Sequence, residues 1–362
     1  MRRESDIVII GAGIMGSSLA YFLSKKGKQV TVLEQGEICS GTSSSTAAWL
    51  WPSDKKPEHY ARLAKDSYDI YMGLEEELGA GFELTINGSL DLARNEEELE
   101  TLQNLCEFNK KMGYDARMLT PEEVYAEEPS VRRDLLGGLL VASDGHLNPF
   151  LLINGYIQAA KKLGAEFNTY TKVEDFVMEG DTIADIVTDK GNIKPGLVIC
   201  AAGIYSRKLA EKFGLDAHVY PERGFCLVSE KLPPILKHTI CGARQTVSGN
   251  IVFGFNADKV DKDCIDRRMY IRGINWAARE AVRDFPALKD VNIIRSYTGI
   301  RCKPDDKFPI LGPTGKVKNL WFHLAHSAYA VSPGASSKIA EVIAGERELS
   351  TLSEYLYSRF DK

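Results

Sequence analysis

A glycine-rich turn near the N-terminus restricts the fold of this chain more than any other feature. The apolar run 6–10 predicts a strand buried on both faces of a parallel sheet, and residues 14–26 predict a helix that ends at Gly27. The turn between them has three glycines in the spacing G-x-G-x-x-G, namely Gly11, Gly13 and Gly16. Such glycines allow a tight turn, the close approach of a pyrophosphate and close packing of the helix on the sheet. With the buried strand at 29–33, the segment predicts a Rossmann-type βαβ unit.

Glu34 ends the second predicted strand, where a carboxylate accepts hydrogen bonds from ribose hydroxyls. An acidic residue at this position argues against a 2′-phosphate, and therefore against NADP. The unpaired N–H groups at the start of the helix favour a phosphate at the turn. This unit alone leaves both NAD and FAD possible as the ligand.

The segment 39–48 is a run of small and hydroxyl-bearing residues directly after the βαβ unit. Small residues let the backbone lie against a ribityl chain and a pyrophosphate, while hydroxyls donate hydrogen bonds to phosphate oxygens. The segment therefore favours FAD over NAD, and a flexible serine-rich loop is the alternative interpretation. The candidate contacts in it are Ser40, Thr42, Ser43, Ala47 and Ala48.

Composition excludes several classes of function. The net charge of −5 and the lack of a long basic run argue against a nucleic-acid partner. Seven cysteines without a C-x-x-C pair indicate neither a zinc site, nor an iron–sulfur cluster, nor a disulfide framework, so no metal is expected. The first apolar run is too short for a signal peptide or a membrane span. We therefore expect a cytoplasmic protein.

Nucleotide-type segments lie at the start, middle and end of the chain, with mixed β segments between them. This interleaving predicts an α/β fold with two discontinuous lobes. We expect a Rossmann-type cofactor-binding lobe formed by residues 1–80, 145–218 and 295–362. The substrate lobe, α+β with a mixed or antiparallel sheet, is expected at 81–144 and 219–294. Within these lobes, Asn87-Gly88 predicts a hairpin between two short strands in 83–93, and the last helix is expected at 336–344.

Taken together, these segments resemble the FAD-dependent D-amino acid oxidase superfamily, in its glycine oxidase and sarcosine oxidase branch. The resemblance spans nearly the whole chain in the family's order. It rests on Gly11 to Gly16 with Glu34, and on residues 40–48, 198–203, 299–312 and 325–333.

The resemblance implies non-covalent FAD and a set of contacts with it. The backbone of Val173 would contact the adenine, and the loop 325–331 would pass the flavin pyrimidine ring, with the next helix directing its N-terminus at the flavin. The full implied set is Gly11, Gly13, Ile14, Met15, Gly16, Glu34, Gln35, Ser40, Thr42, Ser43, Ala47, Ala48, Trp49, Val173, Ala202, Gly203, His326, Ser327, Ala328, Tyr329, Ala330 and Val331. Trp49 and Trp51 are expected near the reactive face of the flavin.

Arg301 is the substrate residue that the resemblance implies, because a guanidinium forms a bidentate pair with a carboxylate. The implied reaction oxidises the C–N bond of an amino acid or N-substituted amino acid by hydride transfer to flavin N5. The resulting imine then hydrolyses in water, and no protein base is required. Arg223 matches another family signature, with its role left open between structure and function.

Three departures from the family pattern bear on this expectation. Gly299 stands where sarcosine oxidases attach flavin to a cysteine, which predicts non-covalent FAD and leaves the role of nearby Cys302 open. Val252 stands near the position of the oxygen-activating lysine, which favours an acceptor other than oxygen. Phe225 and the alanines Ala325 and Ala330 are expected to reshape the substrate pocket.

Three alternative functions and two forms of assembly remain open at this point. The chain is the catalytic subunit of a heteromeric dye-linked dehydrogenase of the opine or proline type, or an NAD-dependent dehydrogenase, or a non-enzymatic flavin-binding subunit. A homo-oligomer or a complex with an electron-transfer subunit is also compatible with the sequence.

Overall fold

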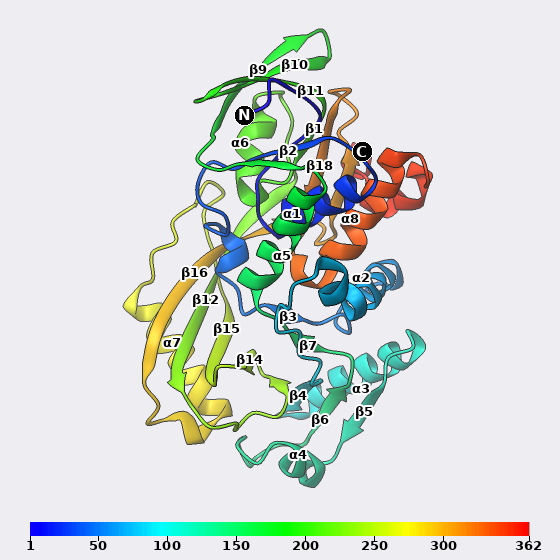
Figure 1. Cartoon of the computed structure of the whole chain (residues 1–362). Helices are drawn as coiled ribbons and strands as arrows, with labels where there is room; N and C mark the ends of the chain where they lie inside the picture. Colours follow the sequence, from blue (N-terminus) through cyan, green and yellow to red (C-terminus); the bar gives the residue numbers. More distant parts are fainter. Residues whose placement is uncertain (362) are drawn as a thin grey trace.

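The computed structural model describes residues 1–361, and for residues 255–259 it describes the backbone only. One eight-stranded sheet has the order β17-β18-β11-β1-β2-β8, with β10 and β9 continuing from β11. It lies at the top of Figure 1. Its strands are β1 (Glu4–Ile10), β2 (Val30–Leu33), β8 (Glu166–Asn168), β9 (Val173–Glu179), β10 (Thr182–Thr188), β11 (Gly191–Cys200), β17 (Ile310–Pro313) and β18 (Leu320–Leu324).

The centre of this first sheet is parallel and buried. β1 pairs in parallel with β2 and β11, and β11 pairs in parallel with β18. All four residues of β2 are buried, as expected for a strand covered on both faces. The carboxyl ends of β1 and β2 carry the glycine turn and Glu34, so both lie at one edge of the sheet.

Helices cover the first sheet and join it to the rest of the molecule. α1 packs against α5 and α8, and α2 packs against α8. Gly16 lets α1 lie close to the glycine turn and β1, because a Cβ there would lie 1.9 Å from the carbonyl oxygen of Gly11. The bounds are α1 (Ile14–Lys25), α2 (Glu58–Leu78), α5 (Pro149–Lys162), α6 (Ser206–Glu211) and α8 (Ala328–Ala344). None of the helices in the described residues is long and apolar enough to span a membrane.

A second eight-stranded sheet has the order β16-β12-β15-β14-β13-β4-β6-β5 and is antiparallel except where β13 pairs with β4. It forms the lower part of Figure 1, with α7 on its outer face. Its strands are β4 (Ser89–Ala93), β5 (Ala116–Leu119), β6 (Gly137–Val141), β12 (Val219–Lys231), β13 (Thr239–Ile240), β14 (Ala243–Gln245), β15 (Asn250–Lys259) and β16 (Ile293–Pro304). The α/β fold with a second, mixed sheet is thereby confirmed.

Shorter elements complete the fold. The helices beside the second sheet are α3 (Glu96–Lys111), α4 (Pro121–Glu127) and α7 (Ile271–Asp284), and a small sheet pairs β3 (Trp49–Leu50) with β7 (Gly145–His146). Short 3₁₀ turns are η1 (Thr42–Ser44), η2 (Gly203–Tyr205), η3 (Pro286–Leu288), η4 (Leu349–Tyr355) and η5 (Tyr357–Phe360). Local signals explain several helix starts, since the side chains of Asn95, Thr120 and Asn148 each accept a hydrogen bond from the first turn of α3, α4 and α5.

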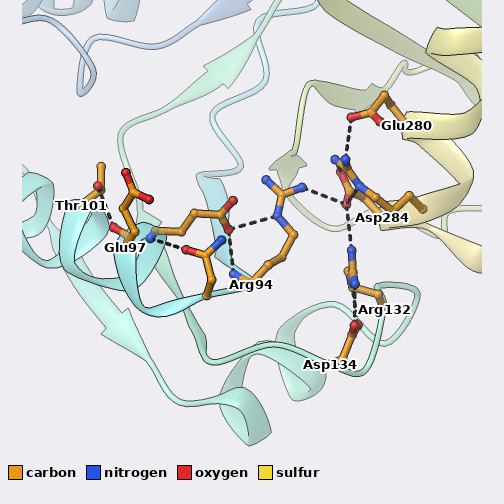
Figure 2. A network of polar contacts seen from close by, with 10 residues as sticks. Arg94, Glu97, Thr101, Arg132, Asp134, Glu280 and Asp284 are labelled. Atoms are coloured by element: carbon orange, nitrogen blue, oxygen red, sulfur yellow. Dashed lines mark hydrogen bonds and ion pairs between the residues drawn. The ribbon is translucent and has the colours of Figure 1, made fainter.

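A buried carboxylate joins the two halves of the second sheet's lobe (Figure 2). Asp284, at the end of α7, accepts hydrogen bonds from Arg94 at 3.3 Å and from Arg283 at 3.1 Å, and Arg132 lies 4.0 Å away. Arg94 also donates to Glu98 in α3 at 3.0 Å. The stretch before β6 is held to the end of α7 by this charge and by the N–H of Arg132, which donates to the carbonyl of Asp284 at 3.1 Å.

Two predicted elements are wrong. No hairpin forms at Asn87-Gly88, because the Asn87 side chain donates to the carbonyl of Lys237 at 2.9 Å and the N–H of Gly88 donates to the carbonyl of Asp144. Those partners are distant in sequence. Asn87 and Gly88 therefore bind other segments of the chain and do not form the turn of a hairpin.

The last helix begins at Ala328, eight residues before the predicted start, and it contains Pro333. Proline cannot donate to the carbonyl of the residue four before it, here Tyr329. The buried hydroxyl of Tyr71 in α2 donates to that carbonyl at 2.8 Å instead. The helix therefore continues through the proline.

The proposed lobe boundaries can be placed on these sheets. The divisions after residues 80, 144 and 218 fall between strands of the two sheets. The division at 295 falls inside β16, which pairs with β12 from Ile293 to Pro304. We therefore keep the two-lobe division as a proposal in which β16 belongs to the second sheet.

Candidate functional site

A single cavity of about 1050 Å³ contains most of the residues singled out from the sequence. Its wall runs from the glycine turn to β12, β15 and β16 of the second sheet. The predicted residues in that wall are Gly11, Gly13, Ile14, Met15, Glu34, Gln35, Ser40, Thr42, Ser43, Ala47, Trp49, Val173, Ala202, Gly203, Arg301, His326, Ser327, Ala328, Tyr329 and Ala330. Gly16, Ala48 and Val331 are buried behind the wall.

The glycine turn has the geometry that phosphate-binding turns require. Gly11 has φ +107°, and a Cβ on it would lie 2.7 Å from the carbonyl oxygen of Ala201 in the neighbouring loop. A Cβ on Gly13 would lie 3.0 Å from Oγ of Ser43. The N–H of Ile14 donates to that same Oγ at 3.0 Å. The serine-rich segment therefore closes directly over the helix N-terminus.

Backbone N–H groups hold the carboxylate of Glu34 at the edge of the cavity. One oxygen accepts from the N–H of Ala12 at 2.9 Å, and the other accepts from the N–H of Gly36 at 2.9 Å. Each carboxylate oxygen has more than one lone pair, so both can accept a further hydrogen bond. The arrangement suits the hydroxyls of a ribose at this edge.

The N-terminus of α8 faces the same cavity. Ser327 precedes the helix in a left-handed conformation with φ 53°, and no side chain caps the first turn. The residues from Ala325 to Ala330 line the cavity. The partial positive charge of a helix N-terminus is therefore available to a group that gains negative charge there.

Arg301, Glu222 and Lys303 form an ion-pair triad at the second-sheet end of the cavity. Arg301 donates to one carboxylate oxygen of Glu222 at 3.1 Å, and Lys303 donates to the other at 2.6 Å. Two cations share one carboxylate, so the triad keeps a net positive charge. Arg301 lies across Gly224, where a Cβ would come within 2.9 Å of its Nε.

Glycines on neighbouring strands leave this part of the second sheet without side chains. A Cβ on Gly254 of β15 would lie 2.7 Å from Cβ of Ala47 and 3.0 Å from the Trp49 ring. A Cβ on Gly299 of β16 would lie 2.7 Å from the carbonyl oxygen of Ser45. The cofactor-side segment 45–49 thus rests directly on the backbone of the second sheet.

Three cysteines in the cavity wall are poor nucleophiles. Burial raises the pKa of Cys302 and of Cys39 to about 12, and that of Cys226 to about 11. These groups remain thiols at neutral pH, and a thiol reacts far more slowly than a thiolate. Gly299, which stands where sarcosine oxidases attach flavin to a cysteine, carries no side chain.

His326 lines the cavity as a neutral imidazole. Burial lowers its pKa to about 3, and the positive charges of Arg301, Lys303 and Lys55 lower it further. Its Nδ1 lies 3.2 Å from Oγ of Ser327. At physiological pH it therefore adds polarity without charge.

Two further residues named from the sequence also lie outside the cavity wall. Phe225 packs against Gly273 of α7 on the opposite face of β12, so the expectation that it shapes the pocket is wrong. The strand period of two explains this, because Gly224 and Cys226 face the cavity. Arg223 also lies outside the wall, and it holds the loop after β15 by donating to the carbonyl of Asp266 at 3.0 Å.

The structure adds charged residues that no sequence motif indicates, namely Asp54, Lys55, Lys172, Glu174, Lys208, Lys212 and Arg267. Lys55 and Arg267 both line the cavity. Arg267 reaches from the loop after β15 and donates to the carbonyl of Ser40. Each of the two reaches the cavity through a loop whose path only the tertiary structure defines.

Comparisons with known proteins agree with this geometry. A family model described as FAD dependent oxidoreductase matches residues 6–342. The chain belongs to this family. FAD is therefore its cofactor, which decides the choice between FAD and NAD that the glycine turn left open. The resemblance to the D-amino acid oxidase superfamily and its glycine oxidase-like branch is confirmed.

Individual relatives cover nearly the whole chain. It is 27% identical to a glycine oxidase of Bacillus subtilis (strain 168), over 95% of this chain and 94% of that protein. It is 27% identical to a subunit of the opine oxidase of Rhizobium meliloti, over 99% and 98%. Among solved structures, glycine oxidase from Geobacillus kaustophilus has a TM-score of 0.92 at 24% identity, covering 99% of each chain. L-proline dehydrogenase from P. horikoshii has a TM-score of 0.91 at 24% identity, covering 100% and 99%.

Proposed function

We propose that this chain oxidises the C–N bond of an amino acid or an N-substituted amino acid. The observation that carries the proposal is the position of Arg301 in the wall of the FAD cavity, where its guanidinium is held by Glu222, which Lys303 also binds. Glycine oxidase and opine oxidase, whose chains resemble this one over almost its full length, are named for substrates that carry an amine and a carboxylate.

Arg301 would bind the substrate carboxylate. A guanidinium has five N–H donors in a planar fork, so pairing with Glu222 is compatible with a second carboxylate. Glu222 fixes the guanidinium, and Lys303 shares the charge of the Glu222 carboxylate. The α-carbon is thereby oriented toward the cofactor, and fixed orientation lowers the barrier of the chemical step.

When bound, FAD would supply a two-electron acceptor for a hydride from the α-carbon; the amine nitrogen would lose its proton, and water would hydrolyse the resulting imine. The protein must then hold the substrate with its amine neutral. His326 is a weak base, because its pKa is lowered to about 3. The amine proton therefore goes to water and not to His326. The partly buried Trp49 and the buried Cys226 and Tyr329 line the cavity and limit the access of water to the reacting atoms.

Anaerobic bleaching of the bound flavin tests this proposal. A panel of amino acids, N-methyl amino acids and opines is added in turn, and loss of the visible absorption of oxidised flavin identifies a substrate. Arg301→Ala should raise KM for carboxylate substrates by about 100-fold, and Arg301→Lys should raise it less. Failure of every amine to bleach the flavin would favour a non-enzymatic flavin-binding subunit.

The comparison with the opine oxidase of Rhizobium meliloti favours a second candidate, in which this chain is the catalytic subunit of a heteromeric dehydrogenase. Val252, in β15, stands in place of the oxygen-activating lysine, which supports an acceptor other than oxygen. Slow reoxidation of the bleached flavin by air, together with co-purification of an iron–sulfur or second flavin subunit, is expected for this candidate. Rapid reoxidation by air would contradict it.

We also propose that FAD is bound without a covalent bond. The thiol pKa values of Cys39, Cys226 and Cys302 and the absence of a side chain at Gly299 support this. Acid precipitation should leave the yellow chromophore in the supernatant. A yellow protein pellet would contradict the proposal.

A further inference from the structure

Lys55 is buried, which is unusual for an ammonium group. Its side chain is 6% exposed and lines the FAD cavity. Among the described residues its ion-pair partner is the adjacent Asp54, whose side chain is 48% exposed. The next residue, Lys56, is exposed and lies 5.2 Å above the ring of Phe108, outside the cavity. The chain therefore buries one lysine of the pair at the cavity and leaves the other on the surface.

The segment that carries Lys55 is anchored. Both the N–H and the hydroxyl of Ser53 donate to the buried carboxylate of Asp144, and the N–H contact is 3.3 Å. Ser89 of β4 donates to the same carboxylate at 2.6 Å. Lys55 is thus held next to the cavity by hydrogen bonds to the second sheet, and its position does not depend on its own side chain.

Lys55 and the Arg301 triad act on the same region of the cavity. Lys55, Arg301 and His326 line one cavity. The charges of Lys55, Arg301 and Lys303 each contribute to the lowered pKa of His326. Asp54 pairs with Lys55, and Glu222 pairs with Arg301 and Lys303. Asp54 also lines the cavity, and its side chain is half exposed, so solvent screens part of its charge.

Two indoles add unpaired donors at this end. The rings of Trp49 and Trp51 are stacked, with centroids 4.6 Å apart and planes at 11°, and both line the cavity. The Nε1 atom of each is buried and has no hydrogen-bond acceptor among the described residues. An indole N–H is a donor only, so both N–H groups are available to an acceptor on a ligand or a water in the cavity.

We infer that Lys55 forms a second anion subsite, and that the substrate is an amine with two carboxylates, one bound by Arg301 and the other by Lys55. The inference rests on the proposed function and specifies its substrate class. The stacked indoles would lie along the carbon chain between the two acids. The second carboxylate stands either on the nitrogen substituent, as in iminodiacetate, or on the side chain, as in glutamate.

Binding can be measured without turnover by using ethers, which have no oxidisable amine. Oxydiacetate has the shape of iminodiacetate, and methoxyacetate has the shape of sarcosine with one carboxylate fewer. Changes in flavin absorbance on titration give Kd for each. The wild-type protein should bind oxydiacetate about tenfold more tightly than methoxyacetate, which corresponds to about 1.4 kcal/mol.

Lys55→Met and Lys56→Met form a matched pair with the same loss of charge at adjacent positions. Lys55→Met should abolish the tenfold preference and leave Kd for methoxyacetate within about twofold, whereas Lys56→Met should change neither value. Lys55→Arg should retain most of the preference. A preference that survives in Lys55→Met, or equal binding of the two ethers by the wild-type protein, would overturn the inference.

Bleaching by amines separates this inference from the proposed function. Iminodiacetate and glutamate, compared with sarcosine and glycine, show which position of the second acid is accepted. If the single acids bleach the flavin as well as the double acids, the proposed function stands and the second subsite is wrong. If no amine bleaches it, the proposed function itself fails. If Lys55→Met does not retain FAD, the wild-type comparison of the two ethers still decides the inference.

Discussion

Arg267 donates a hydrogen bond to the carbonyl oxygen of Ser40 and so joins the loop after β15 to the phosphate end of the cavity. The carbonyl of Arg267 accepts in turn from Thr298 of β16. A cation from the second sheet's lobe therefore lies beside the segment that closes over the cofactor phosphates. Opening of this loop would break the contact.

Arg267→Met should make FAD dissociate about tenfold faster, because a cation and a charged hydrogen bond are lost at the cavity edge. The rise of flavin fluorescence after dilution measures the rate. Arg268→Met is the control, since the Arg268 side chain is 79% exposed and pairs with Asp266. Equal rates in the two variants would show that Arg267 does not retain the cofactor.

Tyr71→Phe should lower the free energy of unfolding by about 1–3 kcal/mol, because it leaves the carbonyl of Tyr329 buried without a donor before Pro333. Tyr68→Phe removes a hydroxyl from the same helix, at a residue that is less buried, and should have little effect. Thermal unfolding of the FAD-bound proteins compares the two. A similar loss in both variants would mean that the Tyr71 hydroxyl has no special role in α8.

Asp144 should make stability depend on pH. Burial raises the pKa of its carboxyl to about 7, so the folded protein retains a proton that the unfolded chain releases near pH 4. Its contribution to stability is complete below about pH 4 and is lost as the pH rises to about 7.

In Asp144→Asn this loss is absent, so the Tm of the variant relative to wild type should rise between pH 4 and pH 7 by about 3 °C. Subtracting the two curves removes the effects of groups common to both proteins, including the buried His146 and His323. A Tm difference that stays constant with pH would argue against a raised pKa at Asp144.

Asp284→Ala should destabilise the second lobe by about 3 kcal/mol, because Arg94 and Arg283 lose their shared buried carboxylate (Figure 2). Asp134→Ala serves as the comparison, since Asp134 pairs with Arg132 at the surface, and such pairs contribute about 0–1 kcal/mol. Chemical denaturation followed by tryptophan fluorescence measures both. Equal losses of unfolding free energy in the two variants would show that burial of the Asp284 network does not add to stability.

The parts of the fold that were predictable depend on contacts close in sequence. The glycine turn, Glu34 and the buried strands around them follow from local spacing and periodicity, and the structure brings them together as expected. Arg301 was assigned from its motif, and it does lie in the cavity wall. Its partner Glu222 was missed, because pairing across β12 and β16 depends on strand register.

The errors share a cause, which is a partner distant in sequence. Asn87-Gly88 has the composition of a hairpin turn. Its donors instead bind the carbonyls of Lys237 and Asp144, which belong to distant segments. Pro333 indicates a helix break, but the Tyr71 hydroxyl removes the penalty. Lys55 has no motif, and its burial follows from hydrogen bonds between its segment and the second sheet.

The strand backbone at Gly224, Gly254 and Gly299, which carries no side chains, has a consequence for directed evolution. A Cβ at any of them would come within 3.0 Å of a neighbouring atom, from the Arg301 side chain at Gly224, from Ala47 at Gly254 and from Ser45 at Gly299. Libraries that vary substrate preference should leave these three codons unchanged. Diversity is better placed in the loops that carry Lys55 and Arg267, where replacement of a side chain does not force two lobes apart.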